Sequence, residues 1–147
     1  MRNILIIACL WLLCSCQNKY TLQSLDETQY LTIINRKETR YIIPKKVISV
    51  PDSGYIKVTY KNQEMGDQMI GCWNKEGKKW VIRLDGVDVI ENKLDTNLYK
   101  FYDLFPVESS GIYSNPTTKG YNGRGCFSLD FEFGDLKRVS GDIKRNK

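Results

Sequence analysis

From residue 30 onward, the apolar residues of this 147-residue chain recur mostly at every second position, in short runs. The clearest run covers 126–133, where Phe and Leu alternate with polar residues and one Cys, and where Phe133 is the last apolar residue. A period of two places alternate side chains on opposite faces of a β-strand. We therefore expect a mainly β fold, in which a single domain over 30–141 forms an antiparallel β-sandwich or a small β-barrel.

Turn-forming residues divide this region into a series of short strands. Strands are expected at 30–34, 39–43, 47–50, 55–60, 68–73, 79–84, 87–90, 126–133 and 136–139. The loop 74–78, which contains a glycine, should join its two flanking strands as a hairpin. Asp85-Gly86 lies between two further strand-like runs, and this dipeptide predicts a second, tighter hairpin.

Residues 94–105 are the one stretch where helical spacing competes with strand spacing. Apolar residues follow one another at i, i+4, i+7 and i+11 from Leu94 to Phe105. Asp95 or Thr96 is a suitable N-cap, and Pro106 would end a helix. This spacing slightly favours one short helix near 94–105 over a strand.

The first sixteen residues form a separate unit. Arg2 precedes an apolar run at 4–13, which is too short for a bilayer that needs roughly 20 apolar residues. The sequence Leu-Cys-Ser-Cys that ends at Cys16 resembles the lipobox of bacterial lipoproteins. The resemblance implies a signal peptide over 1–15 that is cleaved, and a Cys16 that carries acyl chains and holds the chain on a membrane.

The lipoprotein resemblance also implies a location. In this family an Asp just after the lipidated Cys is associated with retention in the inner membrane. Residues 17–20 contain no acid, and the first acidic residue is Asp26. The resemblance therefore implies an anchor in the outer membrane and a domain that faces the periplasm. The polar stretch 16–29 lacks a sustained period and is expected to be the tether between lipid and domain. The basic stretch 142–147 is expected to be a frayed tail.

Charge and cysteine content narrow the possibilities further. Cleavage would remove Arg2 and no acid, so the net charge of +5 would become +4. A small net charge with both signs interspersed is not typical of a nucleic-acid-binding protein, which needs a clustered basic face. With Cys16 acylated, Cys72 and Cys126 remain as an even pair in an oxidising compartment, and we expect a disulfide between them. The alternative is a pair of buried free thiols.

The residue inventory argues against catalysis. The chain has no His, which excludes Ser-His-Asp and Cys-His arrangements and His-ligated zinc. Asp130 and Glu132 share a strand face, but a solvated strand face ordinarily has this spacing. Asp85, Asp88 and Glu91 lack the order of an EF-hand loop. We expect a non-enzyme with no metal site and no cofactor.

Two groups of residues are candidates for binding a partner. Tyr121 and Arg124 lie in a glycine-rich loop over 120–125, and they are residue types that anchor interfaces. The alternative is an ordinary flexible loop.

The second group is basic. Lys75, Lys78 and Lys79 lie at one hairpin end with Trp73 and Trp80, which suggests a basic-aromatic tip that docks on an acidic partner or on anionic headgroups. The alternative is a solvated tip with two tryptophans in the core.

Together these features predict a cell-envelope lipoprotein that acts as a non-catalytic protein-binding module. The arrangement is similar to that of bacterial immunity and inhibitor lipoproteins, which block an envelope-targeted toxin or enzyme. The alternative is a structural or assembly accessory subunit of an envelope complex. The expected partners are the membrane, through the lipid on Cys16, and an envelope or secreted protein, and not nucleic acid.

Overall fold

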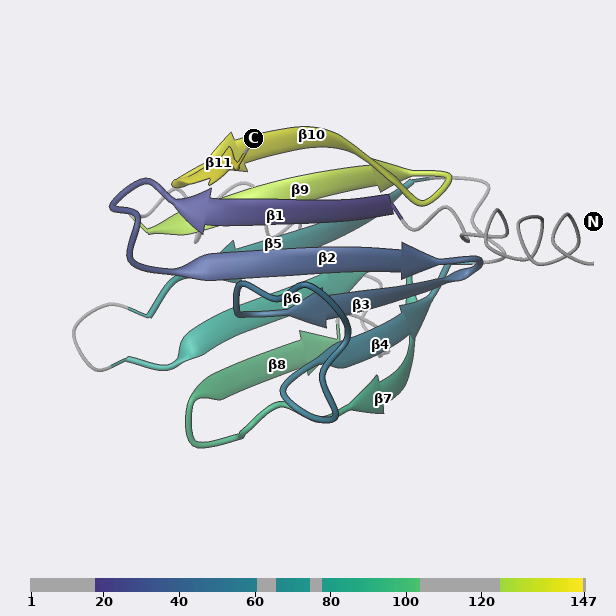
Figure 1. Ribbon diagram of the computed structural model, residues 1–147, viewed down its shortest axis with the longest axis horizontal. Coiled ribbons are helices and arrows are strands. Elements are labelled where there is room, and N and C mark those ends of the chain that lie inside the picture. The colour runs from purple at the N-terminus through teal and green to yellow at the C-terminus, as the bar shows by residue number, and fades with distance from the viewer. Residues whose placement is uncertain (1–17, 61–65, 75–77, 104–124, 147) are drawn as a thin grey trace, which may run out of the picture.

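The computed structural model describes residues 18–60, 66–74, 78–103 and 125–146, and these form eleven strands in two sheets (Figure 1). The two sheets pack face to face as a sandwich and do not close into a barrel. The mainly β fold is therefore confirmed, and the sandwich is the correct one of its two expected forms. Within the described ranges no helix occurs, and so none is long and apolar enough to cross a membrane.

The first sheet has six strands in the order β11-β1-β2-β3-β4-β7, and all its neighbours are antiparallel. The bounds of its strands are β1 Asn18–Ser24, β2 Tyr30–Arg36, β3 Thr39–Ile43, β4 Ile56–Thr59, β7 Asp88–Asn92 and β11 Ile143–Arg145. The second sheet has the order β10-β9-β5-β6-β8, with one parallel pair, β6 and β8. Its strands are β5 Asp67–Cys72, β6 Trp80–Asp85, β8 Tyr99–Asp103, β9 Cys126–Glu132 and β10 Asp135–Gly141.

The core lies between the sheets and follows the period-two pattern. In β9, Phe127, Leu129 and Phe131 are buried, while the alternate residues are half-buried or exposed. Leu22, Leu31, Ile33, Ile42, Ile56, Val58, Met69, Ile82 and Leu84 complete the centre of the core. Each fully buried aliphatic side chain contributes roughly 1.5–3 kcal/mol, so burial of this set is the main force that holds the sheets together.

The two segments that flank the expected domain over 30–141 were predicted to be irregular, and both predictions are wrong for the described residues. Residues 18–24 of the expected tether over 16–29 form β1, which pairs with β2 and β11 and buries Leu22 completely. Part of the expected tail over 142–147 forms β11, whose Ile143 is buried in the core. β11 has only three residues, and it pairs with β1 from the opposite end of the domain's sequence.

The short helix near 94–105 is also absent from the described residues of that stretch. Tyr99–Asp103 is the strand β8, and Trp80 and Leu84 of β6 align with its ends. Asp95 caps only one turn, in which its Oδ1 accepts a hydrogen bond from the backbone N–H of Asn97 at 2.8 Å. Because β6 would otherwise be an open sheet edge, strand pairing overrides the local helical spacing.

Two turns also differ from expectation. Asp85-Gly86 joins strands of different sheets, since β6 belongs to the second sheet and β7 to the first, so the predicted hairpin is wrong. Phe133 does not extend β9: it lies in the β9–β10 turn with a φ of 50°, next to Gly134 at 84°, and is 81% exposed. Two successive positive φ values are typical of a type I′ turn, and for a bulky residue they are costly. No strand forms at 47–50 either.

Cys72 and Cys126 form the predicted disulfide, with an S–S distance of 2.11 Å. The two cysteines face each other across the β5–β9 ladder, and both are half-buried. The bond joins neighbouring strands of the second sheet that are 54 positions apart in the sequence.

A buried ion pair joins the two sheets. Arg40 of β3 is 1% exposed, and its Nη1 donates a hydrogen bond to the carboxylate of Asp67 at the start of β5. Arg40 Nε donates to Asn35 Oδ1 at 3.2 Å, and Asn35 Nδ2 donates to the carbonyl of Gly134. The guanidinium carbon lies 3.6 Å from the ring centroid of Phe131, which adds a cation–π contact.

Burial raises the pKa of Asp67 above its usual 3.8, against the opposing effects of the Arg40 charge and hydrogen bond. A carboxyl group whose pKa is raised on folding contributes its full stabilisation only at pH values below its usual pKa of 3.8. This contribution is lost as the pH rises through the folded-state pKa.

We expect Arg40→Met and Asp67→Asn each to lower the free energy of unfolding by about 3–5 kcal/mol, because each leaves a buried charge or polar group without its partner. The double variant should cost much less than the sum of the two, and chemical denaturation at pH 7 measures all three. Arg138→Met is the matched control, since it breaks the exposed pair of Arg138 with Asp130 and should cost less than about 1 kcal/mol. Additive losses in the double variant would contradict the pairing.

Replacement of both Cys72 and Cys126 by Ser should lower the free energy of unfolding by about 4 kcal/mol, which is the chain-entropy value for a loop of this length. Denaturation of the variant and the parent under identical non-reducing conditions measures the difference. In the unfolded parent, neither cysteine should react with an alkylating reagent until a reductant is added.

Candidate functional site

The structure describes only some of the residues that were predicted to bind a partner. Cys16, Lys75, Tyr121 and Arg124 lie outside the described residues. Lys78 is exposed, and the Nζ of exposed Lys79 donates a hydrogen bond to the carbonyl of Thr96. The described members of the predicted lysine group therefore lie on the surface.

The two tryptophans beside the predicted lysine group belong to the core, which is the alternative interpretation of this hairpin end. Trp73 and Trp80 are 4% and 6% exposed, and their ring centroids lie 4.6 Å apart in an edge-to-face arrangement. Trp73 Nε1 also donates a hydrogen bond to the carbonyl of Asp142. The interpretation of Trp73 and Trp80 as contact residues of a basic-aromatic tip is wrong, because both rings are already packed.

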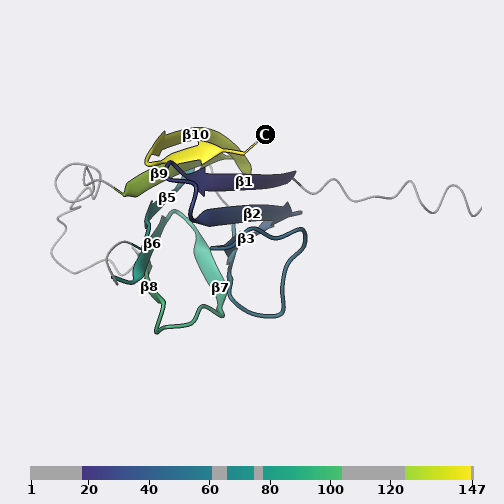
Figure 2. The same ribbon diagram turned by 60° about the vertical axis from the view of Figure 1, so that its left-hand side comes forward.

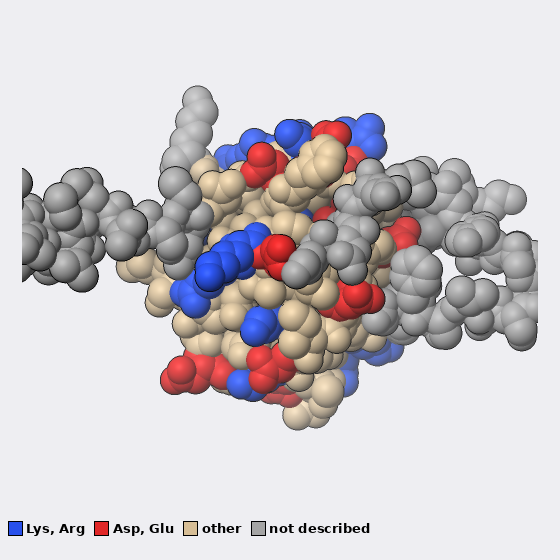
Figure 3. Space-filling model, turned by 90° about the vertical axis from the view of Figure 1, so that its right-hand side faces the viewer, with Lys and Arg blue, Asp and Glu red and all other residues tan. Residues whose placement is uncertain are grey.

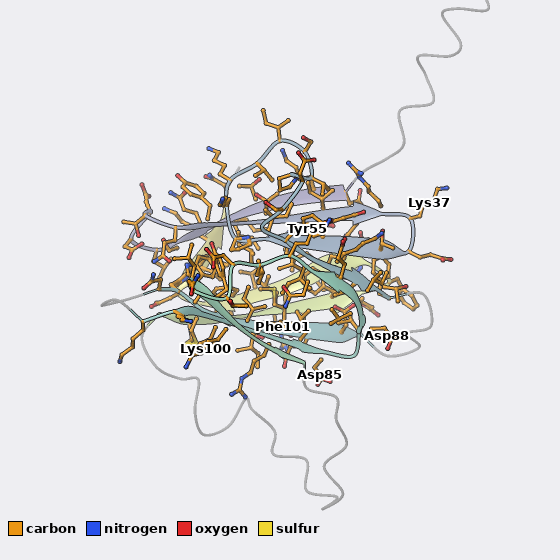
Figure 4. The ribbon with its side chains drawn as sticks, turned by 90° about the horizontal axis from the view of Figure 1, so that it is seen from below. Lys37, Tyr55, Asp85, Asp88, Lys100 and Phe101 are labelled. Carbon is orange, nitrogen blue, oxygen red and sulfur yellow. A yellow bond between two sulfur atoms is a disulfide. The ribbon has the colours of Figure 1, made fainter. Side chains whose placement is uncertain are left out.

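The acidic residues that could have supported catalysis do not form a site. Asp130 accepts a hydrogen bond from Gln68 Nε2 at 2.8 Å and pairs with Arg138, while Glu132 is exposed. Asp85 and Asp88 lie near each other at one end of the sandwich (Figure 4). Among the described side chains, no group of three or more Asp, Glu or Cys is placed so that it could hold a metal ion.

The outer face of the first sheet carries a cluster of tyrosines and cations, which the sequence patterns did not identify. Tyr41 of β3 points outward and is half-buried. The side chains of Arg36 and Lys57 both lie over its ring, each 5.6 Å from the centroid. An aromatic face between two cations stabilises both charges while leaving them at the surface.

Tyr55 and Lys93 extend this cluster towards the β7 edge. The Tyr55 ring packs edge-to-face on Tyr41 at 5.4 Å, and its hydroxyl donates a hydrogen bond to Glu91 Oε2 at 2.7 Å. Lys93 Nζ lies 2.9 Å from the other Glu91 oxygen and 5.4 Å from the Tyr55 ring centroid. We refer to Arg36, Tyr41, Tyr55, Lys57, Glu91 and Lys93 as the tyrosine–lysine platform.

The pKa values within the platform reflect these contacts. The Tyr55 hydrogen bond, with help from Lys93, lowers the pKa of Glu91 below its usual 4.5. The same Glu91 carboxylate raises the pKa of Lys93 above 10.5. At neutral pH the platform therefore presents three cations and one anion.

The segment between β3 and β4 folds over the same sheet face and fixes the platform from one side. Val47 and Val50 of this segment pack against a second buried cluster of Ile34, Ile43 and Tyr55. Tyr55, labelled in Figure 4, is the last residue of this segment and directly precedes β4. The platform is thus held between a packed loop and the pairing of β4 with β7.

Figure 3 shows basic and acidic side chains interspersed on one end of the molecule. Lys57 could have been placed outward from the alternation of 55–60, but its proximity to Glu91 depends on the β4–β7 pairing, which no local pattern indicates.

No protein-family model, no curated protein and no solved structure matches this chain.

The Glu91 contacts give a testable titration. In the parent, carbon-detected NMR should give Glu91 a pKa below 4.5. Tyr55→Phe removes the hydroxyl and keeps the ring, so the Glu91 pKa should rise towards 4.5 without reaching it, because Lys93 remains. Thr59→Val is the control, because Thr59 lies on the same face of β4 as Lys57, and this variant should leave the pKa of Glu91 unchanged. An unchanged Glu91 pKa in Tyr55→Phe would contradict the hydrogen bond.

Proposed function

We propose that this chain is a cell-envelope lipoprotein that works by binding another protein and not by catalysis. In this proposal Cys16 carries the lipid, the anchor lies in the outer membrane, and the sandwich faces the periplasm. The lipobox-like sequence and the disulfide between Cys72 and Cys126 support an oxidising envelope compartment.

The tyrosine–lysine platform is the observation that carries the binding function. Tyr and Arg are enriched where proteins bind one another, and Arg36, Lys57 and Lys93 give the platform an excess of positive charge. Its side chains are held in place by packing and hydrogen bonds before any partner arrives, which lowers the entropy cost of binding. The matching partner surface is acidic and offers groups that can pack against Tyr41.

Two roles fit such a surface. The first is an inhibitor or immunity protein, which covers an envelope-targeted toxin or enzyme. The second is a structural or assembly accessory subunit of an envelope complex. The identity of the partner separates them: an inhibitor abolishes its partner's activity at a one-to-one ratio, whereas an accessory subunit is required for assembly of its complex.

The test uses the full-length lipidated protein, purified with its bound proteins from envelope extracts, and a double charge reversal, Arg36→Glu with Lys57→Glu. The variant should bind the partner at least tenfold more weakly, about 1.4 kcal/mol, because it places negative charge opposite an acidic surface. Lys100→Glu is the matched control, since Lys100 is exposed on β8 of the other sheet (Figure 4). A partner whose binding tolerates the double reversal as well as it tolerates Lys100→Glu does not use the platform.

A further inference from the structure

We infer that Ile48 and Phe133 insert on either side of the lipid anchor into the membrane that holds it, with Lys45, Lys46 and Lys19 on the anionic headgroups. This inference rests on the proposed lipidation of Cys16. It adds a second membrane contact, made by the folded domain itself.

The distance from the anchor to the fold is short. Two peptide units separate Cys16 from Asn18, the first residue of β1, and they span at most about 7 Å. Because β1 pairs with β2 from Asn18 onward, the start of this strand cannot move away from the sheet. A lipid on Cys16 therefore holds this corner of the sandwich within about 10 Å of the headgroups.

The two most exposed large apolar side chains of the described residues both adjoin this corner. Ile48 is 90% exposed and Phe133 is 81% exposed, whereas the other exposed large apolar residues lie between 51% and 55%. Lys19 Nζ donates a hydrogen bond to the carbonyl of Val47, next to Ile48, at 3.4 Å. Asn18 Nδ2 donates to Asp135 Oδ1, two residues after Phe133, at 2.9 Å.

Both apolar side chains are held in position. Thr32 fixes the loop that carries Ile48, because its hydroxyl donates to the carbonyl of Lys45 at 2.7 Å and accepts from the N–H of Val47 at 3.3 Å. Phe133 lies in the tight β9–β10 turn, in a backbone conformation that Gly or Asn adopts more easily. In Figure 1 the start of β1 and the β9–β10 turn lie at the same end of the sandwich, and in Figure 2 the loop between β3 and β4 projects on the side on which β1 starts.

The charges around Ile48 fit an anionic membrane. Lys45 and Lys46 are exposed, Lys19 lies beside the loop, and the sequence has no acid between Glu38 and Asp52. Lysine stems pack along the apolar region while their ammonium groups reach lipid phosphates. Exposed Glu132 precedes Phe133, so the contact of Phe133 is apolar and should not depend on anionic lipid.

A bilayer fits these residues better than a protein does. One aliphatic and one aromatic side chain on separate turns do not form the contiguous core of a protein interface. Interfacial membrane contacts need only separate apolar side chains at a common depth, flanked by lysines.

The test measures which side chains enter the bilayer in the full-length lipidated protein. Ile48→Trp, Phe133→Trp and Leu25→Trp are each reconstituted into phosphatidylglycerol-containing vesicles, with and without bromine on the acyl chains. Leu25 is the matched control: it is 55% exposed and follows the far end of β1, about 20 Å from Asn18. Trp73 and Trp80 are buried and contribute the same background to every variant.

The fluorescence that the introduced Trp adds to the Trp73 and Trp80 background should fall by about half in brominated vesicles for Ile48→Trp and for Phe133→Trp. For Leu25→Trp it should hardly fall. Lys45→Gln with Lys46→Gln should weaken the quenching of Trp at 48 and leave that of Trp at 133 unchanged. Quenching at 48 or at 133 no stronger than at 25 would overturn the inference.

Mass spectrometry of the N-terminal peptide separates this outcome from failure of the proposed function. Acyl chains on Cys16 without quenching would leave the lipoprotein proposal intact and overturn the membrane contact alone. An unmodified Cys16 would overturn both.

Discussion

The alignment of the two sheets depends on the buried pair of Arg40 and Asp67. Apolar side chains hold the sheets together but tolerate sliding, whereas a buried guanidinium must meet its carboxylate. Asn35 extends the contact to Gly134, so the pair, the β9–β10 turn and the first sheet are fixed with respect to one another. Burial raises the pKa of Asp67 against the effect of the Arg40 charge, as expected for a buried pair in which the cost of desolvation offsets much of the attraction.

The sequence predicted well what depends on neighbouring residues and poorly what depends on distant ones. The alternation in 126–132 predicted β9, and the same rule placed β2, β3 and β4. It missed β1 and β11, which have few apolar residues and are stabilised by each other and by β2. The helical spacing near 94–105 was real, but pairing with β6 outweighed it.

The candidate site shows the same contrast between features that neighbouring residues determine and features that depend on distant strands. The disulfide was predictable from the cysteine count and the expected compartment. The tyrosine–lysine platform was not, since it places Glu91 of β7 beside Lys57 of β4, and this pairing of strands that are not consecutive has no local signal. The tryptophans near 75–79 had the composition of a contact surface, yet the core required both rings.

The position of β1 determines how the domain would carry a mechanical load. It lies between β11 and β2, and its first residue is the one nearest to the proposed anchor. In the register of the sheet Lys19 of β1 pairs with Ile34 of β2, and Ile34 pairs with Tyr41 of β3, so the platform lies directly across the strands from the anchored end of β1. A pull between the anchor and a protein bound on the platform therefore runs nearly parallel to the hydrogen bonds between the strands, and it loads the pairing of β1 with β2 from the anchored end, bond by bond, instead of shearing all the bonds together.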